Sequence, residues 1–366
     1  MGHRPPGDRP GTESSPVGRV GGEPVSEHPA LNSVLLRDFL VGRGVDVIGD
    51  LRVDLISGGK SNLTFSVRDD VSHWVVRRPP TSGLTPSAHD MNREWAVTSA
   101  LQQTDVPVAR TVAIDSDGEV FGAPFTVVEF VDGPVIRTST DLKALSDSDI
   151  ERNLDGLVET LARLHEVDYR AVGLGEFGRP DGFVARQVKL WARQWGHVKS
   201  RELDDVDKLV AALGDRVPTE ARNTIVHGDY RVDNTIASAD DPGIVRAVVD
   251  WELSTLGDPL TDIALMCVYR RPGFDQVVGF EAAWTSDRYP SADDIAERYA
   301  TRTGRDLGDW DFYLALANLK LGVVAEGIAH RARAGASSDG AESAGEATAE
   351  FISAGLEQLR GTRNVG

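Results

Sequence analysis

Two acidic residues and one asparagine follow short apolar runs in the second half of the chain. Asp229 and Asn234 lie five residues apart in HGDYRVDN (227–234), and Asp250 ends the apolar run in VVDWE (248–252). In phosphoryl transfer, one aspartate orients the attacking hydroxyl, while an asparagine and a second aspartate hold Mg²⁺ against the nucleotide phosphates. Mg²⁺ keeps several waters and so needs few protein oxygens. The spacing predicts a nucleotide-dependent phosphotransferase, whereas each residue taken alone is equally typical of a turn or a helix cap.

A glycine-containing stretch nearer the N-terminus, ISGGKSNLTFSV (56–67), contains half of a nucleotide-binding P-loop, with a Gly-Lys-Ser triplet that ends at Ser61. The complete pattern requires a glycine where Asp54 stands, and its loop leads from a strand into a helix. Here apolar and polar residues alternate over 62–67, which predicts a strand after the loop. The stretch therefore indicates a hairpin of two strands joined by a glycine turn, and not a P-loop.

The remaining segments predict a β-rich unit followed by a helical one. Apolar spacing and alternation predict the first unit as a helix at 30–41, strands at 50–56, 62–68 and 73–78, a helix at 91–104, and two strands within 108–133. The second unit is predicted as helices at 147–166 and 181–198, short β-like runs at 223–229 and 244–252, and further helices to about residue 359. The Gly/Ala/Ser-rich segment 332–350 is expected to be a flexible loop or a weak helix start. This division gives a disordered Pro/Gly-rich tail (1–29), an N-lobe (30–132) and a C-lobe (133–366).

Composition limits the classes of partner. The 366 residues carry a formal net charge of −18, and an acidic surface of this kind repels nucleic acid and anionic lipid. We find no run of eighteen apolar residues and no signal-peptide pattern at the N-terminus, so we expect neither a membrane span nor export. The single cysteine, Cys267, excludes an internal disulfide and agrees with a cytoplasmic location. A monomer or a homodimer is expected.

Together, HGDYRVDN, VVDWELSTLGDP (248–259) and the Arg-Arg-Pro-Pro run at 77–80 resemble the aminoglycoside phosphotransferase-like family over about residues 45–330. Within it, they are most similar to the kinase-like domain attached to some acyl-CoA dehydrogenases. The resemblance implies an α+β, protein-kinase-like bilobal fold, with a small β-rich N-lobe that contains one inserted helix and a larger, mainly helical C-lobe.

The resemblance also implies roles for residues of the C-lobe. Asp229 matches the catalytic base, His227 the support of the catalytic loop, and Asn234 and Asp250 the Mg²⁺ ligands. Asp258 and Asp262 would hold the loop through backbone N–H groups. His165 is expected to be structural, and Trp191, Trp195 and Tyr269 are candidates for the acceptor pocket.

In the N-lobe, the resemblance implies a nucleotide site for ATP or GTP. The glycine hairpin would cover the phosphates. Arg77 takes the place of the family's usual lysine, and Glu94 is its expected partner on the inserted helix. The remaining expected contacts are the backbone at Gly58 and Gly59, donors at Ser61 and Asn62, and the purine-binding backbone of Glu129 to Val131. Whether Lys60 or Arg78 also contacts phosphate stays open.

The expected activity is transfer of the nucleotide γ-phosphoryl group to a hydroxyl of a small molecule, for which a metabolite such as a hydroxyacyl compound is the preferred acceptor. Two alternatives remain. An aminoglycoside or macrolide kinase would use the same machinery but would require a dense acidic patch in the helical lobe for a polycationic drug. The second alternative is a catalytically inactive nucleotide-binding protein. The expected base, both metal ligands and the cation are all present in the sequence, which disfavours it.

Overall fold

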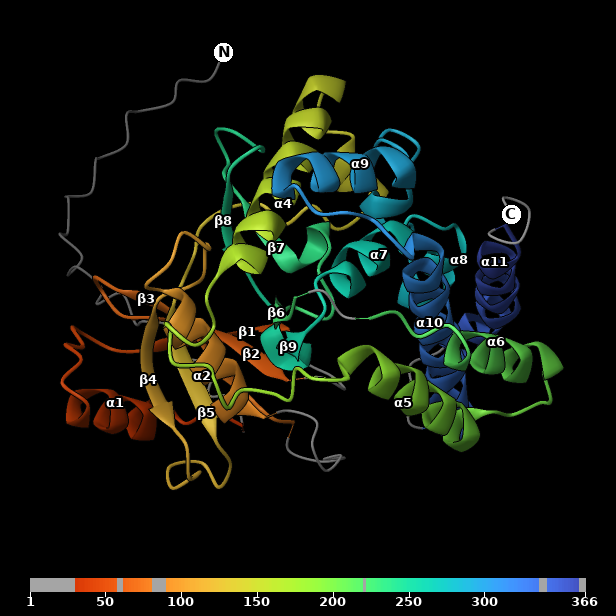
Figure 1. Ribbon diagram of the computed structural model, residues 1–366. Helices are drawn as coiled ribbons and strands as arrows, with labels where there is room; N and C mark the ends of the chain where they lie inside the picture. Colours follow the sequence, from red (N-terminus) through yellow and green to blue (C-terminus); the bar gives the residue numbers. More distant parts are fainter. Residues whose placement is uncertain (1–29, 58–61, 81–89, 220–221, 336–340, 362–366) are drawn as a thin grey trace, which may run out of the picture.

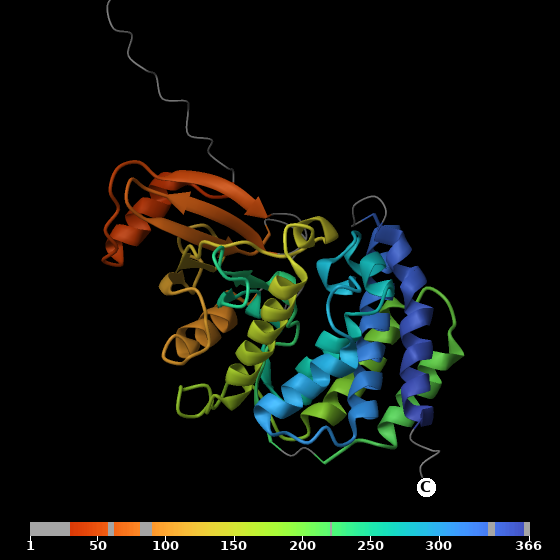
Figure 2. The ribbon, with the colours of Figure 1, turned by 90° about the horizontal axis from the view of Figure 1, so that it is seen from above.

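The computed structural model describes residues 30–57, 62–80, 90–219, 222–335 and 341–361, which form one lobe built on a β-sheet and one mainly helical lobe (Figures 1 and 2). This organisation confirms the α+β bilobal fold expected from the sequence. The domain limits given above stay predictions.

The first lobe is a five-stranded antiparallel sheet in the order β1-β2-β3-β5-β4. Its elements in chain order are α1 (Ser33–Gly42), β1 (Arg52–Ser57), β2 (Leu63–Arg68), β3 (His73–Arg78), α2 (Met91–Leu101), β4 (Thr111–Asp115) and β5 (Phe125–Glu129). The side chain of Asn32 accepts hydrogen bonds from the first amides of α1 and so fixes where this helix begins.

Alternation along β3 sends its side chains to opposite faces of the sheet. Val76 is fully buried in a cluster with Leu36 and Leu40 of α1, so α1 covers this face. Arg78 lies on the same face and donates to the backbone oxygens of Ala30 and Phe121. Arg77 therefore lies on the opposite face, toward α2, and Arg78 is engaged away from it.

The second lobe contains most of the helices. They are α3 (Ser139–Leu142), α4 (Asp147–Glu166), α5 (Phe183–Val198), α6 (Asp204–Gly214), α7 (Leu260–Val268), α8 (Gly273–Val278), α9 (Ala292–Thr303), α10 (Trp310–Arg333) and α11 (Ala347–Gly361). Capping boxes at Ser146 and Ser291 fix the starts of α4 and α9. Helix α10 is long and apolar enough to cross a membrane, but 78% of its apolar window is buried within the protein, as in a core helix. Helices α10 and α11 lie side by side in both views (Figures 1 and 2).

Two short antiparallel ladders lie between these helices. Strand β6 (Thr224–Val226) pairs with β9 (Thr255–Gly257), and β7 (Thr235–Ala237) pairs with β8 (Val245–Val248). The sequence indicated β6 and β8 but neither of their partners, because β7 and β9 each contain a single large apolar residue and so show no apolar run. Both ladders surround the loops that carry the predicted catalytic residues.

The boundaries differ from the predictions at two further places. The first helix begins three residues later than expected, at Ser33, because Asn32 caps it. In the segment 332–350, the described residues form the end of α10, a 3₁₀ helix (η4, Ala341–Glu346) and the start of α11, so the second of the two expectations, a helix start, fits its last residues. Ala344 and Gly345 of η4 are buried against α10, and this packing orders residues whose composition also agreed with a loop.

Candidate active site

The catalytic loop runs from β6 to β7 and turns at Gly228. This glycine has φ = 82°, and a Cβ atom built on it would lie 2.7 Å from the backbone oxygen of Leu253. The turn therefore needs glycine for its conformation and for its space. It directs Asp229 away from the strand that precedes it.

His227 joins this loop to the one that carries Asp250. Its ring is fully buried; Nε2–H donates to the backbone oxygen of Val249 at 3.0 Å, and Nδ1 accepts from the amide of Asp229 at 3.2 Å. These two bonds require the neutral tautomer with the proton on Nε2. The histidine is thus placed to support the loop, without contact to the site that a substrate would use.

Polar groups on several sides fix the Asp229 carboxylate. Asn234 Nδ2 donates to the backbone oxygen of Asp229 at 2.8 Å and to its Oδ2 at 3.1 Å, while the Tyr269 hydroxyl donates to Oδ1. The Arg231 guanidinium lies 3.4 Å from Oδ1 and 2.7 Å from Asp233. Burial disfavours the charged form of Arg231, but Asp229 and Asp233 raise its pKa above the ordinary value. A carboxylate held in this way is oriented before an acceptor arrives.

Asp250 follows β8 and has a left-handed backbone conformation, with φ = 66°. Among the non-glycine residues that the structure describes, only Asp309 also has a positive φ. Such a conformation costs about 1–2 kcal/mol for a residue with a Cβ atom. Because the strain lies at a predicted metal ligand, it agrees with a functional constraint on the direction of this side chain.

Arg77 connects the two lobes at this point. Its Nη1 lies 3.2 Å from Glu94 Oε1 on α2, and its Nη2 lies 3.1 Å from Asp250 Oδ1. Burial disfavours the charged guanidinium, but the carboxylates of Glu94 and Asp250 raise the pKa of Arg77 above its ordinary value. The structure thus brings together the predicted phosphate cation, its glutamate and the predicted metal ligand.

The donor set suits Mg²⁺ held by few protein oxygens. Asn234 uses its Nδ2 for Asp229, which leaves Oδ1 as a ligand atom beside the carboxylate of Asp250. Burial, and after it the carboxylate of Asp250, raise the pKa of nearby Glu252 to about 7. The described part of the chain contains no cluster of three or more His, Cys, Asp or Glu side chains arranged for a metal. A site of one Asp and one Asn, completed by water and phosphate, is the kind that these residues fit.

The nucleotide-side predictions are only partly covered by the structure. Gly58, Gly59, Lys60 and Ser61 lie outside the described residues, while Asn62 is buried next to β2. At the predicted purine contact, the amide of Glu129 donates to Arg110 and that of Phe130 to His73. Within 129–131, the amide of Val131 is therefore the donor with no such backbone bond among the described residues.

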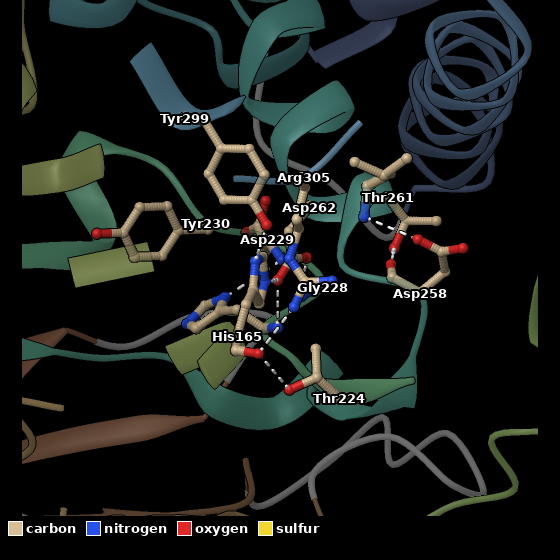
Figure 3. Close-up of polar contacts among 12 residues, drawn as sticks. His165, Thr224, Gly228, Asp229, Tyr230, Asp258, Thr261, Asp262, Tyr299 and Arg305 are labelled. Atoms are coloured by element: carbon tan, nitrogen blue, oxygen red, sulfur yellow. Dashed lines mark hydrogen bonds and ion pairs between the residues drawn. The ribbon is translucent and has the colours of Figure 1, made fainter. Parts of the chain in front are cut away.

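A buried network holds the loop from behind (Figure 3). Asp262 of α7 accepts from the amides of His227 at 2.6 Å and Gly228 at 2.8 Å, and its Oδ2 lies 3.3 Å from His165 Nε2. Burial opposes ionisation of Asp262, but its contacts with His165 and His227 lower its pKa below the ordinary value. His165 Nδ1 meets the Tyr299 hydroxyl at 2.7 Å, which agrees with the structural role expected for this histidine.

Asp258 has a different position from Asp262. It accepts from the amide of Leu260 at 2.9 Å and from the Tyr313 hydroxyl at 2.7 Å, at the start of α7. These contacts attach α7 to α10, whereas the contacts expected from the sequence were to the catalytic loop.

A cavity of about 210 Å³ adjoins the loop between α5, α7 and α10, and Gly228, Trp191 and Lys320 lie in its wall. Trp195 is buried in the core. Three residues near the site were not predicted, although the sequence contains a signal for each. Arg231 and Glu252 fall inside the two catalytic motifs, and Lys320 interrupts an apolar helical run. Tyr269 was a candidate for the acceptor pocket, and in the structure its hydroxyl contacts Asp229 directly.

Comparison with known proteins agrees with this geometry. The sequence model of the phosphotransferase enzyme family, APH, matches residues 52–298. Mouse acyl-CoA dehydrogenase family member 10 is 31% identical over 331 residues, which cover 89% of this chain and 31% of that protein. The chain thus spans about a third of the length of this relative.

Solved structures show the same fold. A protein of Ralstonia eutropha JMP134, provisionally named an aminoglycoside phosphotransferase, has a TM-score of 0.78 and 31% identity, over 90% of this chain and 98% of its own. A thermostable mutant of aminoglycoside phosphotransferase APH(4)-Ia, solved with AMP-PNP and hygromycin B, has a TM-score of 0.59 and 15% identity, over 90% and 99% of the two chains. The extent of the family match and the identity to the Ralstonia protein establish that the chain belongs to the phosphotransferase enzyme family.

Proposed function

We propose that the protein is a small-molecule kinase that transfers the γ-phosphoryl group of ATP or GTP to a hydroxyl, with Mg²⁺ as its metal. The observation that carries this proposal is the meeting of both lobes at Asp250. There Arg77 of the sheet lobe contacts Glu94 and Asp250, and Asn234 of the helical lobe holds Asp229. A nucleotide site, a metal site and a base at one junction are the parts that phosphoryl transfer needs.

In the proposed reaction, the acceptor hydroxyl donates its hydrogen bond to Asp229. Its oxygen forms a bond to the γ-phosphorus as the bond from that phosphorus to the β–γ bridging oxygen breaks. The hydroxyl proton passes to Asp229, and the nucleoside diphosphate leaves. Mg²⁺, held by Asn234 and Asp250, supplies charge neutralisation on the phosphates.

Among the described residues, Arg77 and Arg231 are the arginines that contact Asp250 and Asp229. Arg77 is anchored by Glu94, so its guanidinium is oriented toward the junction of the lobes where phosphate oxygens would lie. A guanidinium is planar and has several N–H donors in fixed directions, so it can bind a carboxylate and a phosphate oxygen at the same time. The ammonium of a lysine is a point charge without these fixed directions.

For the acceptor, we propose a metabolite hydroxyl such as that of a hydroxyacyl compound. The support is that this chain is similar to a part of an acyl-CoA dehydrogenase family member. An antibiotic acceptor has weaker support. The Ralstonia protein, 31% identical, is an aminoglycoside phosphotransferase by provisional name only, and the APH(4)-Ia structure solved with hygromycin B is 15% identical and supports the fold alone.

The test is incubation of the full chain with γ-labelled ATP or GTP, Mg²⁺ and fractionated metabolite extract. We expect a labelled product in the extract, its loss in Asp229→Ala, and no label on a panel of aminoglycosides and macrolides. Nucleotide binding of Asp229→Ala should stay within a few-fold of the native value, because this side chain contacts the acceptor. Failure of the native protein to bind nucleotide with Mg²⁺ would reject the kinase proposal. If only a drug were labelled, the proposed metabolite acceptor would be wrong and an antibiotic would take its place.

A further inference from the structure

The middle of α10 carries a lysine in an otherwise apolar stretch, LANLKLGVV (316–324). The neighbours of Lys320 in the helix, Leu319 and Leu321, are buried in the core of the helical lobe. An ammonium in such surroundings is unfavourable unless it has polar partners. Burial lowers the pKa of Lys320 below its ordinary value, while Asp229 and Asp262 act in the opposite direction.

The partners of Lys320 satisfy only part of its hydrogen-bonding capacity. Its Nζ donates to the backbone oxygen of Gly228 at 2.6 Å and lies 5.6 Å from the centre of the Trp191 ring. An ammonium has three N–H donors. Among the described residues, the oxygen of Gly228 is its one hydrogen-bond acceptor, and no carboxylate lies within 4.0 Å of Nζ. Two donors therefore have no acceptor within this part of the chain.

The cavity beside the catalytic loop is the space that these donors border. Most of its exposed wall is apolar, and the larger apolar side chains in it are Phe183, Leu190, Trp191, Leu253, Leu265 and Leu316. Asp262 is the one acid in its lining, and both of its oxygens are already bonded to the loop amides and His165. The charge that the cavity offers to a ligand is therefore positive.

The cavity also lies next to the proposed base. Gly228, whose oxygen holds Lys320, forms part of its wall and directly precedes Asp229 in the chain. A molecule in the cavity would thus border both Lys320 and the residue that directly precedes the base.

We propose that this cavity is the acceptor site and that Lys320 pairs with a negatively charged group of the acceptor, a carboxylate or a phosphate, while the apolar part of the acceptor lies against Trp191. This inference rests on the proposed kinase function and narrows its substrate class to anionic, partly apolar alcohols. A polycationic aminoglycoside is disfavoured, because its ammonium groups would meet a cation and no available carboxylate in the cavity wall.

The test compares four six-carbon probes that differ only in their head group: hexanoate, hexyl phosphate, hexanol and hexylamine. Their dissociation constants for the full chain are measured by titration calorimetry in the presence of ADP and Mg²⁺. A hydrogen bond between charged partners predicts binding of hexanoate or hexyl phosphate about tenfold tighter than that of hexanol, with hexylamine weakest. Whichever of hexanoate and hexyl phosphate binds more tightly identifies the anionic group, carboxylate or phosphate, with which Lys320 pairs.

Lys320→Met should abolish the preference for the anion, and Lys189→Met is the matched control, since Lys189 is an exposed lysine of α5. Equal binding of hexanol or hexylamine by the native protein would overturn the inference, as would a preference that survives in Lys320→Met. If that variant does not fold, the head-group comparison on the native chain decides alone. A separate measurement of nucleotide binding distinguishes the two proposals. If the native protein binds nucleotide but shows no preference for anionic probes, only the acceptor-site inference fails. If it does not bind nucleotide, the proposed kinase function fails.

Discussion

Asp262→Asn tests the buried network behind the catalytic loop. The carboxylate receives two backbone amides, from His227 and Gly228, and lies 3.3 Å from His165 Nε2. An asparagine of the same size keeps one acceptor oxygen and presents an NH₂ group at the other position. His165 can exchange its tautomer to accept from this NH₂ group, but a backbone amide cannot, so one of the two loop amides loses its partner in either orientation.

The expected loss follows from these contacts. A buried amide without an acceptor costs about 1–3 kcal/mol, and replacing a charged acceptor by a neutral one weakens the remaining bond by about 1 kcal/mol. We therefore expect Asp262→Asn to lower the free energy of unfolding by about 2–4 kcal/mol, which urea denaturation followed by circular dichroism can measure.

The matched control for this experiment is Asp155→Asn. Its carboxylate is 66% exposed and pairs with Arg298 at 2.7 Å on the surface. Exposed ion pairs contribute about 0–1 kcal/mol, so this variant should stay within 1 kcal/mol of the native protein. If Asp262→Asn destabilises no more than Asp155→Asn, then Asp262 does not hold the loop in the way we describe.

Three further predictions follow from other contacts. Tyr269→Phe removes the hydrogen-bond donor to Asp229 but keeps the ring. A hydrogen bond to a charged group is worth about 1.5–3 kcal/mol, so this variant should lower kcat by roughly 10- to 100-fold with nucleotide affinity unchanged. An unchanged kcat would contradict the positioning role of Tyr269. Hydrogen bonds from Arg302 lower the pKa of Glu159 to about 2, so its contribution to stability should be present above pH 4.5 and disappear as the pH falls toward 2. The difference between native protein and Glu159→Gln in urea, about 1 kcal/mol at pH 7 because the pair is partly exposed, should therefore vanish near pH 2, and a difference independent of pH would be inconsistent with this pairing. Gly228→Ala should destabilise by at least about 2 kcal/mol in the same assay, because of its left-handed backbone and the Leu253 oxygen 2.7 Å from the new Cβ atom, and unchanged stability would argue against this turn.

The parts of the site that could be predicted are those whose signal is local in sequence. Asp229 and Asn234 lie five residues apart on one loop, so their spacing in sequence is enough to predict that they lie close together. Arg77 was expected from the resemblance, at the place of the family's usual lysine, and strand alternation supported it over Arg78. The structure places the two guanidinium groups on opposite faces of the sheet. The bilobal α+β fold was likewise visible as a change in periodicity near residue 133.

The parts that could not be predicted depend on contacts between distant segments. Tyr269 reaches Asp229 across 40 residues and Lys320 reaches Gly228 across 92, and no pattern near either residue indicates its partner. The partners of β6 and β8 were missed for the same reason, since β7 and β9 each have one large apolar residue and are defined by their pairing with a distant strand. Asp258 and Asp262 looked equivalent in sequence, yet one turn of helix directs them to different neighbours.

Arg77 has a consequence for the way in which the two lobes respond to ligands. Its two terminal nitrogens contact carboxylates that belong to different lobes, and one of those carboxylates is also the proposed metal ligand. A cation that takes Asp250 therefore competes with one of the contacts between the lobes, beside the bonds from Arg93 to the Ser254 oxygen. By reciprocity, a change that breaks the Arg77–Asp250 pair frees Asp250 to bind a cation more tightly. Metal affinity and interlobe opening are then coupled equilibria, and Arg77 is a residue through which each changes the other.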